Sequence, residues 1–193
     1  MACTSLTKGR GLDCNRSSGG VKHIFFGVYD QFTAPLETVG LVVVDSEVTD
    51  IEMASNVLYR YTPPRGSSQI METITGSTDN GTISYQPTCS MVLNRLSKAD
   101  QQEIKLLGQT QVIIFAQLNE QLANGHDVIV ALGVTNAMQL NAGTADSGTA
   151  FADRNGYTLN FDGFEADPFP MVADYTTNPF DNGAFTNVSI TSS

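Results

Sequence analysis

GTISYQPTCSMVLN, residues Gly81–Asn94, is the longest run of two-residue alternation in the sequence. One side of the run is apolar, whereas the other carries uncharged hydroxyl and amide side chains. The apolar side comprises Ile83, Tyr85, Cys89, Met91 and Leu93, and the polar side comprises Thr82, Ser84, Gln86, Thr88 and Ser90. A period of two is typical of a β-strand whose successive side chains point to opposite faces of a sheet.

This strand would be unusually long. At about 3.3 Å per residue it would reach roughly 45 Å, about twice the length of an ordinary strand. Pro87 interrupts the run, which predicts either a bulge or an unpaired N–H at that position. Two interpretations of the polar side stay open: a long solvent-facing strand of a sandwich, or a strand that lines a water-filled channel.

The rest of the chain predicts a mainly β fold, an antiparallel β-sandwich or partial barrel with one flanking α-helix. Four Asn-Gly pairs begin at Asn80, Asn124, Asn155 and Asn182, and this dipeptide favours β-hairpin turns. The helix is predicted over Ser97–Leu107, with Ser97 as its N-cap and Gly108 at its end. Its few apolar residues predict a short, narrow buried stripe.

The expected strands fall into two kinds. Three apolar runs predict strands buried on both faces, with a bulge at Gly27, and these are Val21–Tyr29, Gln111–Leu118 and Asp127–Leu132. The others are hairpin or edge strands, and these are Val39–Asp45 and Val48–Met53 around an Asp45-Ser46 turn, Gln69–Thr75, Val134–Leu140, Thr149–Asp153 with Tyr157–Asp162, and Phe185–Ile190.

A chain of 193 residues predicts a single domain. We expect residues 1–20 to form an N-terminal arm and residues 174–193 a C-terminal tail. TPPRG at Thr62–Gly66 forbids regular structure, so residues 54–68 are expected to project as a loop that contacts a neighbouring subunit. The candidate contact residues in this loop are Arg60, Tyr61, Pro63, Pro64 and Arg65.

Catalytic and metal-binding patterns are missing from the sequence. It has two histidines, no tryptophan and no nucleotide-binding, hydrolase or zinc-peptidase motif. Cys3, Cys14 and Cys89 cannot all pair, which favours intracellular thiols, and the spacing of Cys3, Cys14 and His23 matches no zinc-ligand pattern. The basic start lacks an apolar core, which predicts no secretory signal. We therefore expect no enzyme activity, no cofactor and no metal.

Charge is unevenly distributed in the sequence. The net charge of −10 argues against attraction to nucleic acid. Cations gather in the first segment, and these are Lys8, Arg10, Arg16 and Lys22. Acids dominate the last quarter, and these are Asp146, Asp153, Asp162, Glu165, Asp167, Asp174 and Asp181. Opposite charge at the two ends favours head-to-tail contact between copies, although a solvated surface explains it equally well.

Two stretches resemble a known family. SGTAFADRNGYTLNFDGFEADPFPMV (Ser147–Val172) and GLDCNRSSGGVKHIFFGVYDQF (Gly11–Phe32) are similar to the tail tube proteins of tailed bacteriophages, which are related to the type VI secretion tube protein. The resemblance implies six-membered rings that stack into a hollow tube through which DNA leaves the capsid. It also implies contacts with sheath, tape measure and baseplate proteins and a place in the virion tail after assembly in the host cytoplasm, without a membrane.

We therefore expect a self-assembling tube subunit whose polar strand face, Thr82 to Ser90, lines the lumen. DNA would pass without specific binding. That face has no acid of its own, so lumenal charge must come from other strands. The alternatives are another virion component, either a tail terminator or a capsid decoration protein, and a glycan-binding β-sandwich module.

Overall fold

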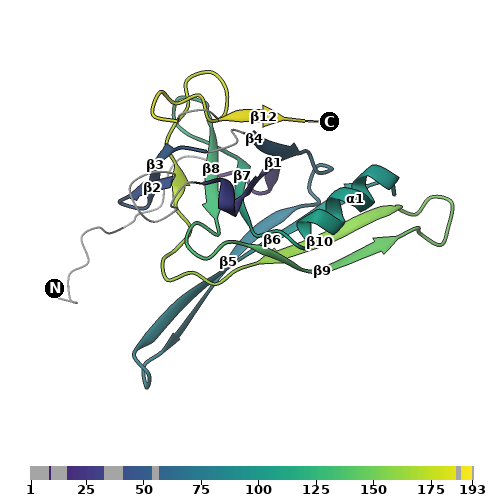
Figure 1. The fold of residues 1–193 in the computed structure, drawn as a ribbon, viewed down its shortest axis with the longest axis horizontal. Coiled ribbons are helices and arrows are strands. Elements are labelled where there is room, and N and C mark those ends of the chain that lie inside the picture. The colour runs from purple at the N-terminus through teal and green to yellow at the C-terminus, as the bar shows by residue number, and fades with distance from the viewer. Residues whose placement is uncertain (1–8, 10–16, 33–40, 54–56, 186–187, 193) are drawn as a thin grey trace.

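The computed structural model describes residues 9, 17–32, 41–53, 57–185 and 188–192. Two β-sheets and one α-helix make up this part of the chain (Figure 1). The eight-stranded sheet contains, in spatial order, β12 (Ser189–Thr191), β4 (Val57–Tyr61), β1 (Val21–Val28), β7 (Val112–Gln121), β8 (Asp127–Leu132), β11 (Met171–Val172), β3 (Glu47–Ile51) and β2 (Leu41–Val44). The four-stranded sheet contains β5 (Gln69–Ser77), β6 (Thr82–Asn94), β10 (Gly156–Asp162) and β9 (Gln139–Asp146). The fold is the predicted β-sandwich with a flanking helix.

The eight-stranded sheet curls around a core of its own. Every one of its strands contributes an apolar side chain to one cluster, including the edge strands β2 and β12. A flat sheet cannot bring both edges to one cluster, so the sheet is a partial barrel. Phe25, Phe115 and Phe180 meet edge to face at its centre, with ring centroids 5.1 and 5.2 Å apart.

A second core lies between the two sheets. The other face of the eight-stranded sheet presents Ile24 and Phe26 of β1 and Ile114 of β7. These side chains pack with Met91 of β6 and Phe161 of β10. The three central strands β1, β7 and β8 therefore supply residues to both cores, which confirms the expectation that these apolar runs are buried on two faces.

Helix α1 (Lys98–Leu107) begins and ends as the sequence predicts. The Ser97 hydroxyl accepts the Asp100 N–H at 3.0 Å and donates to the Asp100 carboxylate at 2.5 Å. Ile104 and Leu107 pack against the second core, whereas no residue of the helix is fully buried. The buried stripe is as narrow as its composition indicates.

β6 is the long strand that the alternation predicts. Its register with β5 runs through Pro87 without a shift, and its register with β10 is unbroken from Asn94 to Thr88, so the predicted bulge is absent at Pro87. The Pro87 carbonyl accepts the Gly163 N–H, beyond the last residue of β10. The N–H that proline lacks would point to the same side, where the β10 ladder has already ended.

Only some of the predicted turns are hairpin turns. Asp45 and Ser46, with φ of 50° and 67°, join β2 to β3 as expected, and the Asn-Gly pairs at Asn80 and Asn124 join β5 to β6 and β7 to β8. The pair at Asn155 lies at the end of the long β9–β10 loop and not at a two-residue turn, and the pair at Asn182 does not connect two paired strands. Gly156 instead lies where a Cβ would meet the Leu93 carbonyl at 2.0 Å.

Three strand predictions are wrong. Residues 134–136 form a turn flanked by Gly133 and Ala137, whose φ values are 74° and 64°; Met138 makes an isolated bridge with Val112, and β9 begins only at Gln139. Thr149–Asp153 lies in a loop, since β10 pairs with β9 instead. Gly27 carries no bulge: a Cβ there would lie 2.7 Å from the Phe32 ring, and the register shift occurs between Val21 and His23.

The expected projecting loop and tail are also corrected. Residues 57–61 form β4, which pairs with β1 and β12 inside the eight-stranded sheet, so the loop is confined to residues 62–68; residues 54–56 lie outside the described chain. Phe180 and Phe185 are buried in the first core, so the C-terminal segment is part of the body. Of the N-terminal arm, residues 9 and 17–20 are described and exposed.

Candidate assembly surface

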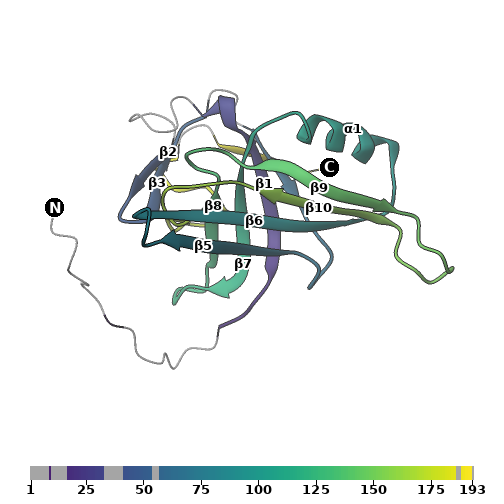
Figure 2. The same cartoon turned by 90° about the horizontal axis from the view of Figure 1, so that it is seen from below.

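The four-stranded sheet has an outer face turned away from the rest of the described chain. The eight-stranded sheet and α1 both lie on its other side (Figures 1 and 2). Residues paired directly across neighbouring strands share a face. Thr88 therefore lies between Met71 of β5 and Asp162 of β10, and Ser90 lies between Gln69 and Asn160.

The predicted lumen residues all lie on this outer face. Thr82 and Ser84 are exposed, whereas Gln86, Thr88 and Ser90 are partly buried between the neighbouring strands. The Thr88 hydroxyl donates to the Met71 carbonyl at 3.1 Å. The face thus carries mainly hydroxyl and amide groups, as the alternation indicates.

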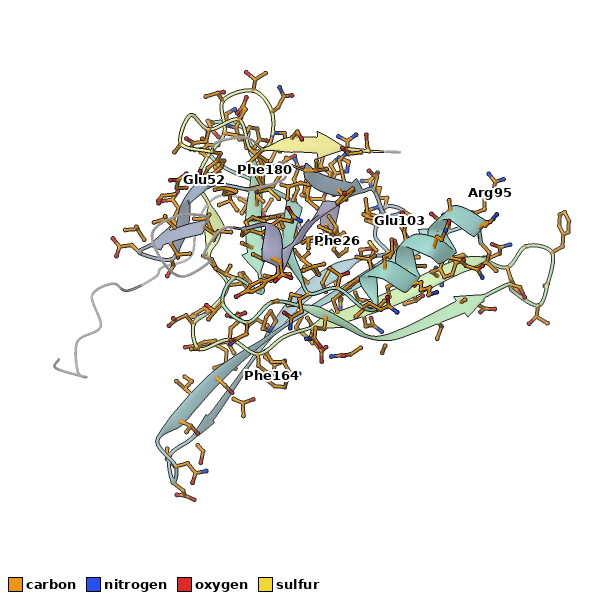
Figure 3. The ribbon with its side chains drawn as sticks, in the orientation of Figure 1. Phe26, Glu52, Arg95, Glu103, Phe164 and Phe180 are labelled. Atoms are coloured by element: carbon orange, nitrogen blue, oxygen red, sulfur yellow. The ribbon has the colours of Figure 1, made fainter. Side chains whose placement is uncertain are left out.

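Two features of this face come from residues outside β6. Asp162 supplies an acid beside Thr88 and accepts a hydrogen bond from the Asn141 amide, so a neighbouring strand provides charge there. Met71 and Phe164, which are 51% and 62% exposed, interrupt the polar surface with apolar groups. Figure 3 shows Phe164 beneath the sheet, on the side away from the body.

Both edges of the four-stranded sheet are open in the described chain. β5 and β9 each pair with a strand on one side only. Neither edge contains lysine or proline, the residues with which natural edge strands discourage pairing, and their lengths are nine and eight residues. Long unprotected edges of this kind are available for pairing with another chain.

The two open edges run in opposite directions. All three pairings in the sheet are antiparallel, and four strands put opposite directions at the two borders. Tyr85 and Glu165 exchange N–H···O bonds of 3.0 and 2.8 Å, which fixes the side to which each residue directs its amide. By alternation along the registers, Gly143 and Ala145 of β9 and Ile74 of β5 direct their amides outward.

The sheet also extends beyond the body (Figure 1). Gly156 pairs with Asn94, so the β9–β10 loop lies at the Asn94 end, opposite the β5–β6 turn. Near that turn the inner face is uncovered, and Ile74 and Ile83 are 61% and 58% exposed. The apolar alternation of β6 therefore continues past the residues that cover it.

The proposed inter-ring residues do not form one surface. Arg60 is exposed on β4 and donates to the Ser192 hydroxyl at 3.1 Å, whereas Tyr61 packs edge to face on Phe26 at 5.2 Å. Burial is the main cause that raises the pKa of Tyr61 to about 12. Pro63 is buried, and Arg65 is exposed. Only part of this set is accessible to a neighbour.

A polar cluster between β7, β8 and the C-terminal segment is the strongest candidate for chemistry. His126 stacks on Tyr175 at 4.5 Å and its Nδ1 lies 2.7 Å from Asp174, whose pKa the contact lowers. Buried Asp127 is held by Lys22 at 2.5 Å and by the Gln117 amide at 2.8 Å. These contacts pair the charged groups with one another, although the buried Gln117 Oε1 has no hydrogen-bond partner, so the cluster is explained mainly as a structural network.

The described part of the chain contains one free cysteine, Cys89. Cys89 is buried, and burial raises the pKa of its thiol to about 12, which keeps the reactive thiolate scarce. Cys3 and Cys14 lie outside the described chain. Within the described ranges, no group of three or more His, Cys, Asp or Glu side chains could hold a metal ion.

Comparison of the chain with family models, curated proteins and solved structures gave no match. In the portion of the chain that is described, no helix has the length and apolar character to cross a membrane.

Proposed function

We propose that this chain is a structural subunit that closes into rings through β9 of one copy and β5 of the next. The rings would stack into the tail tube of a bacteriophage, the conduit for genome ejection. The observation that carries the proposal is the four-stranded sheet, which has two long open edges of opposite direction and one uncovered polar face. Rotation about a pore axis brings β9 against β5 of the neighbour in antiparallel order.

The polar face suits a passage for DNA. Ring closure by these edges places Thr82, Ser84, Gln86, Thr88 and Ser90 on one face of a continuous barrel, opposite the face that packs on the body. Hydroxyl and amide groups keep the surface hydrated without attracting phosphate. With −10 per chain, six copies would carry on the order of −60 per ring, and Asp162 adds negative charge on the proposed lumen face.

Assembly is tested with the full chain and one edge substitution. Ala145→Pro removes an outward amide without touching the inward bonds of β9, so the subunit should fold but fail to close rings. Ala145→Ser keeps the amide and serves as the control. Negative-stain electron microscopy and sedimentation velocity should show rings or tubes for the wild type and Ala145→Ser, and monomers for Ala145→Pro.

Two outcomes would contradict the proposal. A wild-type chain that stays monomeric at high concentration has no assembly function, and an Ala145→Pro variant that still forms rings excludes this edge. Rings that never grow into tubes would favour the tail terminator instead.

A further inference from the structure

The loop between β9 and β10, residues 147–155, carries a phenylalanine in full contact with solvent. Phe151 is completely exposed, whereas the next most exposed phenylalanine of the described chain, Phe164, is 62% exposed. A ring left in water forgoes the stabilisation that burying its apolar surface would give. Figure 3 shows this loop at the end of the molecule beside α1 and Arg95, with an aromatic side chain at its tip.

The loop around Phe151 is held by hydrogen bonds on both sides. The Asp153 carboxylate accepts the N–H groups of Thr149 and Ala150 at 2.9 and 2.6 Å, and these bonds, that to Ala150 first, lower the pKa of Asp153. Asn155 accepts the Leu96 N–H at 2.8 Å and the Arg95 N–H at 2.7 Å. A ring presented by an ordered loop loses little conformational entropy on binding.

An apolar pocket lies at the opposite end of the molecule. It has a volume of about 370 Å³, and its lining includes Leu41, Val43, Val134, Pro168 and Phe169. The Tyr85–Glu165 bridge places residues 164–170 toward the β5–β6 turn, away from Asn94 and the β9–β10 loop. Because a cavity of about 150 Å³ accepts benzene, this pocket has room for a phenylalanine ring.

The two ends also differ in charge. The end that bears Phe151 carries both signs: the cations are Arg95, Lys98, Lys105 and Arg154, and the acids are Asp100, Glu103, Asp146 and Asp153. The β2–β3 hairpin beside the pocket carries Asp45, Glu47 and Asp50 and no cation, and Asp167 lies in the pocket wall. An Arg154 brought to that wall would face acid instead of like charge.

We propose that Phe151 of one copy inserts into the apolar pocket lined by Leu41, Val43 and Phe169 of a second copy. The donor and the acceptor lie at opposite ends of the chain, so the contact is heterologous and repeats without limit along an axis. This inference rests on the proposed function and identifies the contact that joins successive rings. The inference assigns the contact between rings to the β9–β10 loop instead of to residues 54–68.

The first experiment compares substitutions at the two halves of the contact. Phe151→Ala and Val43→Lys should each weaken stacking at least about tenfold, because an anchor residue in a pocket carries much of the binding energy. Rings should remain, since β5 and β9 are untouched. Leu106→Lys, at an exposed apolar site on α1 next to a different pocket, is the control and should stack normally. Tube length by electron microscopy measures the effect.

The second experiment uses disulfide trapping in a Cys3→Ser, Cys14→Ser background. Phe151→Cys and Val43→Cys proteins, each purified alone, should form a crosslinked heterodimer when they are mixed under oxidising conditions. A Phe151→Cys homodimer would instead indicate contact between two loops and overturn the inference. Phe151→Ala tubes of normal length would also overturn it while leaving ring assembly intact, whereas a wild type without rings would contradict the proposed function itself.

Discussion

The two sheets of this protein differ in how much of their surface is buried. The eight-stranded sheet is covered on both faces at its central strands β1, β7 and β8, because it curls around one core and lies on a second. The four-stranded sheet is covered on one face alone, and there only in its central part, from Pro87 to Met91 on β6 and from Tyr157 to Phe161 on β10. In the described chain the eight-stranded sheet leaves only the short edge strands β2 and β12 unpaired on one side, whereas the four-stranded sheet leaves a face, two long edges and two ends to the surroundings.

With the proposed function, this difference predicts that substitutions that affect folding and substitutions that affect assembly lie in different parts of the subunit. Substitutions in the eight-stranded sheet and on the inner face should act mainly on folding, since they remove buried apolar contacts. Substitutions on the outer face, the edges and the loop tips should act mainly on contacts between copies. The following predictions test that division inside one subunit.

Two phenylalanines close together in the chain give the largest contrast. Phe161 is 1% exposed and its ring lies 5.0 Å from that of Phe26, whereas Phe164 points away from the core. Phe161→Ala should lower the free energy of unfolding by about 3 to 5 kcal/mol. Phe164→Ala should change it by less than about 0.5 kcal/mol. Urea denaturation measures both, and comparable losses would show that the outer face is covered.

Helix α1 gives an intermediate effect, because it extends the cover of the inner face toward Asn94. Ser97→Ala removes the hydroxyl that accepts the Asp100 N–H, so the free energy of unfolding should fall by about 1 kcal/mol. Ser97→Asn keeps a capping oxygen and should retain most of the stability. Thermal unfolding followed by circular dichroism distinguishes the two; equal losses would mean that packing, rather than capping, fixes this end.

The smallest effect concerns Glu165, which joins the two regions. Burial raises the pKa of Glu165 above its usual 4.5, although N–H groups of Asn136 and Thr135 bind the carboxylate at 3.0 and 3.1 Å. The folded protein therefore holds this proton more tightly than the unfolded chain. Its contribution to stability is complete below pH 4.5 and is lost as the pH rises through the folded-state pKa.

Glu165→Gln removes this titration. The free energy of unfolding of the wild type minus that of Glu165→Gln should fall as the pH rises from about 4 to about 7. Glu103→Gln, at an exposed position of α1, is the control for the loss of one carboxylate. Urea denaturation at several pH values measures the difference, and a difference that grows with pH would contradict the assignment.

The sequence predicts well where a local rule acts alone. The β6 strand follows from the alternation of Gly81–Asn94, and α1 follows from Ser97 and Gly108. It fails at β9, because the run Gln139–Asp146 has few apolar residues and owes its strand conformation to pairing with β10. It also fails for residues 57–61, since the prolines that follow suggest a loop while β1 and β12 hold those residues in a sheet.

The candidate surface likewise has features that the sequence predicts and features that it does not. The polar side of β6 is visible in the sequence, but Asp162, the open edges and the exposure of Phe151 are not. Each of these depends on which strands meet, and pairing partners far apart in the chain leave no periodic signal. The sequence alone determined the strands with strong alternation and the capped helix, because side-chain direction and capping are local. Only the tertiary structure decided which face, edges and loop stay uncovered, because burial depends on the neighbours that the whole chain brings together.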